Sequence, residues 1–161
     1  ETTAQEFVSL LRLARAYAMT NKSVDEAVPE GGFGFYFNAD GKDDGPDTNL
    51  DIVRAFVFAD TNKNGQYDGA SDGNALELGD LVPSYISISV AIDEVDTPTH
   101  DFWIIFAPES ADVTYGAFDT EDNSINLINA KTIDIKISFS DIRTYNIHMN
   151  KISRFFELTL E

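Results

Sequence analysis

The loop that follows residue 59 contains the residues best suited to chemistry in this chain. Asp60, Asn62 and Asn64 alternate along it, and Gly65 follows directly. In DxDxDG calcium loops, alternating oxygen side chains converge on one point, glycine permits the sharp turn, and the next residue offers its backbone carbonyl. The sequence therefore predicts a calcium site whose ligands are Asp60, Asn62, Asn64, the carbonyl of Gln66, Asp68 and a closing acid.

The closing ligand of this loop departs from the calcium pattern. Ser71 holds the twelfth position, where a bidentate Glu belongs, and Asp72 comes one residue later. Three alternatives follow: the loop is one residue longer and Asp72 closes the site, a more distant acid such as Glu77 closes it, or these turn-forming residues make a hairpin loop without metal. We take Asp72 as the closing ligand and expect weak affinity, roughly 10⁻⁴ to 10⁻³ M.

Other chemistry finds little support in the sequence. The acidic loop 38–49 lacks the alternation, so we expect a solvated turn there. His100 and His148 are isolated, and the chain has no cysteine, no GxSxG motif and no glycine-rich phosphate loop. We therefore expect no enzyme activity, and we assign Trp103, which stands in an apolar run, to the core.

The overall charge narrows the classes of partner. The formal net charge is −17, from 28 acidic and 11 basic residues. Such a chain repels phosphate backbones and anionic lipid headgroups, whereas it attracts hard divalent cations. With 43% hydrophobic residues and twelve Phe, it is not a disordered acidic tail. No apolar run approaches the roughly 20 residues of a membrane span.

The elements that must position the loop are one helix and many strands. Apolar residues recur at helical spacing in the first twenty positions, namely Phe7, Leu10, Leu11, Ala14 and Ala18, and the helix should end near 21–23. From Gly31 onward the runs 33–37, 53–59, 86–92, 102–107 and 133–139 predict strands, and 143–149 and 152–160 predict a terminal hairpin.

This order of elements predicts an α+β fold in one domain, 1–161. An N-terminal amphipathic helix, 1–22, packs on a predominantly antiparallel β-sheet body, 31–161, which the strands can form as two small sheets.

Several stretches resemble one known family. The helical stretch 7–22, with its L..AR..A...N pattern, resembles the end of the pilin helix in minor pseudopilins of the H and FimT-like branch. Residues 31–37, GGFGFYF, and 56–68, FVFADTNKNGQYD, are similar to a GGYGVYF strand and a FADxNxNGxYD segment of those proteins. Residues 102–108 and 152–158 resemble two of their later strands, so the likeness touches segments across nearly the whole chain.

The resemblance implies a prepilin-type structural subunit of a bacterial type IV pilus-like or type II secretion filament. Its partners would be other pilin or pseudopilin subunits, and a hydrophobic half-helix upstream of Glu1 would anchor it in the inner membrane. The head would then lie outside the cytoplasm, in the periplasm or at the cell surface. Some FimT-like proteins are linked to DNA uptake, but the tail of this chain balances Arg143, Lys151 and Arg154 with acids, so we expect no nucleic-acid binding.

A second class of function fits part of the same pattern. An extracellular β-rich module for adhesion or carbohydrate binding can also carry a calcium-stabilised loop. The upstream sequence discriminates between the two, because only the filament subunit requires about 20 apolar residues after a short basic leader.

Overall fold

The computed structural model describes residues 2–38, 55–67, 73–78, 86–97, 101–110, 112–119, 123–125, 127, 129–139, 143–150 and 155–160. The helix α1 spans Thr2–Met19. The strands are β1 (Gly32–Asn38), β2 (Ala55–Asp60), β3 (Gly73–Leu78), β4 (Ile86–Ile92), β5 (Val95–Thr97), β6 (Asp101–Phe106), β7 (Val113–Phe118), β8 (Thr132–Phe139), β9 (Arg143–Asn150) and β10 (Phe155–Leu160).

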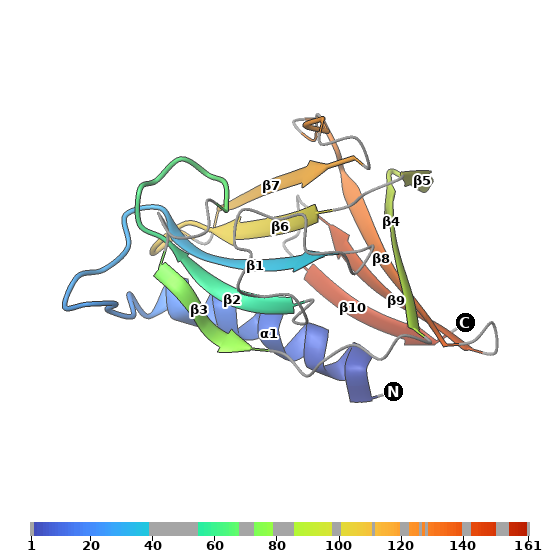
Figure 1. The fold of residues 1–161 in the computed structure, drawn as a ribbon, viewed down its shortest axis with the longest axis horizontal. Helices are drawn as coiled ribbons and strands as arrows, with labels where there is room; N and C mark the ends of the chain where they lie inside the picture. Colours follow the sequence, from blue (N-terminus) through green and yellow to red (C-terminus); the bar gives the residue numbers. More distant parts are fainter. Residues whose placement is uncertain are drawn as a thin grey trace.

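The strands form two antiparallel sheets, and α1 packs on them (Figure 1). Sheet 1 has the order β3-β2-β1-β6-β7, and sheet 2 has the order β10-β9-β8-β4-β5. The predicted α+β fold with one N-terminal helix on antiparallel sheet is confirmed, as is the terminal hairpin of β9 and β10. The strands β3, β5 and β7 were not predicted.

The helix buries the predicted face. Its side chains at Phe7, Leu10, Leu11, Ala14 and Ala18 are all buried, whereas Arg12 and Arg15 are exposed. At its end Asn21 takes a positive φ of 51°, Lys22 N–H donates to the Tyr17 carbonyl and Asn21 N–H donates to the Ala18 carbonyl. These are the two hydrogen bonds of a Schellman motif, which satisfies the last carbonyls of a helix.

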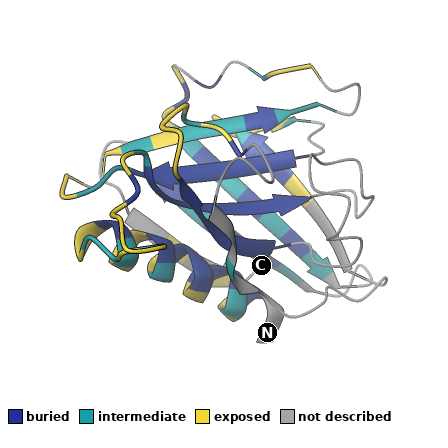
Figure 2. Cartoon of the chain, turned by 60° about the vertical axis from the view of Figure 1, so that its left-hand side comes forward, coloured by how far each residue is buried: buried dark blue, intermediate teal, exposed yellow. Residues whose placement is uncertain are grey.

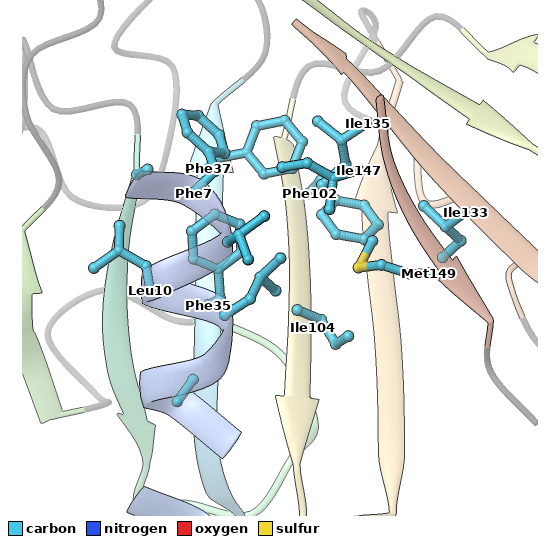
Figure 3. Close-up of a cluster of buried hydrophobic side chains, with 14 of the residues drawn as sticks. Phe7, Leu10, Phe35, Phe37, Phe102, Ile104, Ile133, Ile135, Ile147 and Met149 are labelled. Atoms are coloured by element: carbon cyan, nitrogen blue, oxygen red, sulfur yellow. The ribbon is translucent and has the colours of Figure 1, made fainter. Parts of the chain in front are cut away.

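The main core lies between α1, the inner face of sheet 1 and sheet 2. Phe7 of α1 meets Phe35 and Phe37 of β1 edge to face, with ring centroids 5.7 and 5.8 Å apart. Figure 3 shows these rings together with Ile135 and Ile147 of sheet 2. Each such buried side chain stabilises the fold by about 1.5–3 kcal/mol relative to exposure, so this layer orients α1 on the sheets.

A second, aromatic cluster covers the outer face of sheet 1. It comprises Tyr36, Phe56, Phe58, Tyr67, Trp103 and Ile105. The central strands β1, β2 and β6 are consequently buried at every residue (Figure 2). At the centre of the cluster the ring of Phe58 lies over its cross-strand partner Gly34, where a Cβ would overlap two ring carbons. Phe58 can occupy this position only because residue 34 has no side chain.

A tight hairpin joins β4 to β5 and is fastened to the start of β8. Its two loop residues, Asp93 and Glu94, have φ values of 49° and 69°, as a type I′ turn requires. The Asp93 carboxylate accepts hydrogen bonds from the backbone N–H groups of Lys131 and Thr132, at 2.8 and 3.0 Å. These bonds hold the pKa of Asp93 below its usual value.

Candidate functional site

The candidate site begins at Asp60, the last residue of β2. Asp60 is 1% exposed, and its Oδ2 accepts a hydrogen bond from Gly65 N–H at 3.1 Å. Its backbone carbonyl accepts from Gly31 N–H at 3.0 Å, and a Cβ on Gly31 would overlap the carboxylate. A carboxylate is therefore held inside the protein, against backbone, at the first position of the predicted calcium loop.

The two asparagines of the loop fold back onto its own backbone. Asn62 Oδ1 accepts from Asn64 N–H at 3.1 Å, and Asn64 Oδ1 accepts from Gln66 N–H at 2.9 Å. Both are Asx turns, in which the side chain fixes the backbone two residues on. An amide oxygen has two lone pairs, so each of these oxygens can accept the hydrogen bond and still bind a cation.

The loop is attached to the aromatic cluster at two points. Trp103 Nε1 donates a hydrogen bond to the Gly65 carbonyl at 3.1 Å. Tyr67, which is 6% exposed, packs its ring against Tyr36, Phe56 and Phe58 with centroids 4.7 to 5.1 Å apart. The loop between Asp60 and Tyr67 therefore has a fixed place on the outer face of sheet 1.

The predicted metal ligands fall into two groups. Asp60, Asn62, Asn64 and Gln66 belong to this one loop, while Asp68 and Asp72 lie outside the described residues. Glu77, the alternative closing acid, pairs through its backbone with Val57, about 10 Å along the strand from Asp60. Gly73, by contrast, pairs with Ala59, so β3 starts beside the residue that precedes Asp60. The register therefore favours an acid near the start of β3 over Glu77.

The described part of the chain contains no group of three or more His, Cys, Asp or Glu side chains that could hold a metal ion. Asn side chains and backbone carbonyls are ordinary calcium ligands too, and this loop supplies both. The calcium site thus stays a prediction that depends on Asp60, on the two asparagines and on acids beyond the described residues.

A buried polar group that the sequence did not reveal lies where β1 ends and β6 begins. Asp101, 3% exposed, accepts hydrogen bonds from Tyr36 Oη and from Asn38 Nδ2, the latter at 3.1 Å. Burial, and next the negative charge of Asp101, raise the pKa of Tyr36 far above its usual value. These residues lie 63 and 65 positions apart, and only the β1–β6 register brings them together. These hydrogen bonds join buried polar side chains beside the aromatic cluster, to which Tyr36 belongs.

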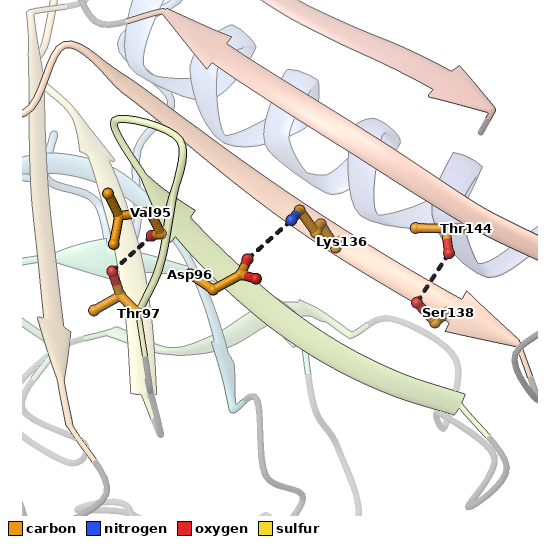
Figure 4. Close-up of polar contacts among 6 residues, drawn as sticks. All are labelled: Val95, Asp96, Thr97, Lys136, Ser138 and Thr144. Atoms are coloured by element: carbon orange, nitrogen blue, oxygen red, sulfur yellow. Dashed lines mark hydrogen bonds and ion pairs between the residues drawn. The ribbon is translucent and has the colours of Figure 1, made fainter.

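The outer face of sheet 2 carries polar pairs between strands: Lys136 of β8 reaches across β4 to Asp96 of β5, and the other two pairs join the neighbours β8 and β9. Lys136 Nζ lies 2.9 Å from Asp96 Oδ1, and the hydroxyls of Ser138 and Thr144 lie 3.2 Å apart (Figure 4). His148 Nδ1 lies 2.6 Å from Asp134 Oδ1, its direct partner in the β8–β9 register. The expectation that His148 sits at the surface of a strand fits its half-buried position. His100 lies outside the described residues.

The comparisons with known proteins found no relative of this chain. No family model matches the chain, and no curated protein or solved structure is similar to it at a significant level. Among the described residues, no helix is both long and apolar enough to span a membrane.

Proposed function

We propose that this chain is the head domain of a filament subunit, a minor pilin or pseudopilin of a type IV pilus-like or type II secretion filament. The observation that carries the proposal is the place of α1. One face of this single N-terminal helix is buried along β1, β2 and β6, and the opposite face is exposed. A helix held in this way gives a β-rich body a fixed orientation relative to the chain that precedes it.

The proposal is supported by the sequence stretches that resemble minor pseudopilins, which correspond to α1, to β1 and to β2 with its loop. On this proposal the partners are other pilin or pseudopilin subunits, and the inner membrane is reached through a helical segment upstream of Glu1. The head works outside the cytoplasm in a structural role, without catalysis. Nucleic acid is not proposed as a partner, because the net charge of −17 repels it.

Calcium is proposed as the ion of the loop, with Asp60, Asn62, Asn64, the Gln66 carbonyl, Asp68 and Asp72 as ligands. The buried Asp60 carboxylate supports this assignment, because desolvation of a carboxylate is costly and a bound cation offsets it. The calcium-bound loop would then stabilise the outer face of sheet 1, since Gly65 and Tyr67 are attached to the aromatic cluster.

The filament assignment is tested on the full precursor. We expect a short basic leader and about 20 apolar residues before Glu1, cleavage by a prepilin peptidase, and recovery of the mature chain in the membrane fraction. Antibodies against this domain should label filaments in electron micrographs, and deletion of the gene should reduce filament number or length. A cleaved secretory signal with no remaining apolar helix would instead support the extracellular binding module.

The calcium assignment is tested by thermal unfolding and by the fluorescence of Trp103, the only tryptophan. At a calcium concentration tenfold above Kd, binding adds about 1.4 kcal/mol to the free energy of unfolding, which raises Tm by roughly 3–6 °C. Emission should change with the same midpoint, because the Trp103 indole is hydrogen-bonded to the loop. Asp60→Asn together with Asp68→Asn should abolish both responses, while Asp96→Asn on sheet 2 keeps them. Equal changes in Tm and in fluorescence in the native chain, the double variant and the Asp96→Asn control would contradict the calcium site.

A further inference from the structure

The charge of this chain is divided unevenly between α1 and the rest. Residues 1–22 hold two acidic and three basic residues, whereas residues 23–161 hold 26 acidic and eight basic residues. The stretch 1–22, which contains α1, therefore has a formal net charge of +1, whereas the rest of the chain has a formal net charge of −18. In a molecule of net charge −17, the exposed face of α1 is consequently the natural place for an acidic surface to bind.

Two arginines and a methionine form a stripe on this face. Arg12, Arg15 and Met19 follow at spacings of three and four, so they lie on one side of the helix over about 10 Å. Both arginines are exposed, and Met19 is 48% exposed. Within the described residues neither arginine has an ion-pair partner. Arg and Met are enriched at protein interfaces. We call these three residues the basic stripe.

The complementary surface is the turn that follows the helix. Asp25, Glu26 and Glu30 are exposed there, and they surround Val28, which is 41% exposed. We call these four residues the acidic turn. Among the described residues only three large hydrophobic side chains are exposed, and one lies in each of these two surfaces. Each surface thus has an apolar centre and charges of one sign, and the two signs are opposite.

Within one molecule these surfaces belong to different parts of the chain. The segment between α1 and β1, which carries the acidic turn, projects beyond the C-terminal end of α1 (Figure 1). The basic stripe lies on the exposed side of α1 itself. Contact between two stripes would bring four arginines together, and contact between two turns would bring six carboxylates together. Only stripe against turn pairs opposite charges. Such a contact joins two different surfaces, so it repeats from copy to copy.

We propose that the basic stripe of one copy of this chain binds the acidic turn of a second copy, head to tail. The inference deepens the proposed function and rests on it, since it names the contact by which filament subunits associate. Exposed ion pairs contribute roughly 0–1 kcal/mol each, so two isolated domains associate only weakly. The contact forms along a whole filament because neighbouring subunits there are already aligned, which raises their effective concentration.

The absence of cysteine from the sequence allows a direct test by crosslinking. Ala16→Cys places a thiol beside the basic stripe, and Ala27→Cys places one in the acidic turn; both alanines are exposed. A mixture of the two variants, treated with a short bis-maleimide, should give a yield of crosslinked dimer several-fold higher than the yield from either variant alone. Ser89→Cys, exposed on sheet 2, is the matched control and should give only background with both.

Charge reversal and rescue decide whether the charges cause the contact. Arg12→Glu with Arg15→Glu in the Ala16→Cys chain should lower the yield of mixed dimer roughly fivefold to tenfold. Asp25→Lys with Glu26→Lys in the Ala27→Cys partner should restore it. Circular dichroism confirms that each variant is folded. Yields equal to the Ser89→Cys control, or unaffected by reversal, would overturn the contact.

The geometry of the contact is read from a chain that carries both cysteines. Head-to-tail binding predicts a ladder of crosslinked products larger than the dimer. Products no larger than the dimer would contradict the head-to-tail arrangement. If crosslinking fails while antibodies against the domain still label filaments, only the contact is wrong. If crosslinking succeeds and the domain is absent from filaments, the filament assignment is wrong.

Discussion

The substitution Gly34→Ala tests the outer face of sheet 1, on which the candidate loop depends. A Cβ at residue 34 would lie well inside 3.0 Å of two carbons of the Phe58 ring. That ring is 0% exposed and packs on Tyr67, with centroids 5.0 Å apart, so it has no free space to enter. Gly34 also lies in β1, the middle strand of its sheet, where the backbone is paired on both sides.

The expected cost follows from two opposing effects. Overpacking of this kind destabilises by about 1–3 kcal/mol, and the fixed ring places Gly34→Ala near the upper end. Replacing glycine by alanine also restricts the unfolded chain, which returns about 0.4–1 kcal/mol. We therefore expect a net loss of about 2 kcal/mol in the free energy of unfolding, which lowers Tm by roughly 4–8 °C.

The assay is a double-mutant cycle by urea unfolding. Phe58→Leu alone should cost about 1–2 kcal/mol, because it removes buried ring carbons. The double variant should be at least about 1 kcal/mol more stable than additivity predicts, since the smaller leucine makes room for the new methyl group. Gly34→Ala combined with Ile133→Val, in sheet 2, should be additive within about 0.5 kcal/mol. Additivity of Gly34→Ala with Phe58→Leu would refute the overlap as the cause.

Three further predictions concern turns and titrating groups. Glu94→Gly should raise the free energy of unfolding by up to about 1 kcal/mol in urea, because residue 94 has φ 69°, while Glu157→Gly in extended β10 should lower it. Asp93→Ala should lower the free energy of unfolding. Because hydrogen bonds lower the pKa of Asp93 in the folded chain, the free-energy difference between the variant and the native chain should be largest above about pH 4 and should shrink as the pH falls below that value. Burial raises the pKa of Tyr115 to about 12, so the stability of the native chain should fall as pH rises from about 10 towards 12, and Tyr115→Phe should reduce that slope in alkaline urea titrations.

The sequence predicted the elements whose pattern is local and complete. The helix was found because its apolar spacing matches one turn, and β1, β4, β6, β8 and β9 were found from alternation or continuous apolar runs. The missed strands lack such patterns. Four of the six residues of β3 are Ala, Leu or Glu, which favour helices, and its register with β2 is irregular. Gly116 interrupts β7, yet it lies under the ring of Trp103, so packing rather than a turn explains it.

The candidate site likewise has a part that the sequence revealed and a part that it did not. The loop from Asp60 to Gln66 was visible because its residues are adjacent in the sequence, and its Asx turns use partners two residues away. The Asp101 group and the Asp134–His148 pair depend on strand register, which residue types alone do not determine. The closing ligand of the loop was ambiguous for the same reason, and the β2–β3 register is what makes Glu77 less suitable.

Sheet 1 separates the two proposed sites physically. The odd-numbered residues of β1 and β2, such as Phe35 and Val57, face α1 and the main core, whereas Tyr36, Phe56 and Phe58 face the aromatic cluster that holds the loop. Calcium bound in the loop, as proposed, would therefore stabilise the side of the sheet opposite to the basic stripe. Because the two sites share no side chain, their effects should be independent. Asp60→Asn should remove the proposed calcium response, and it should leave the yield of crosslinked product unchanged in calcium-free buffer. A change there would mean that β1 and β2 transmit the state of the loop to the helix.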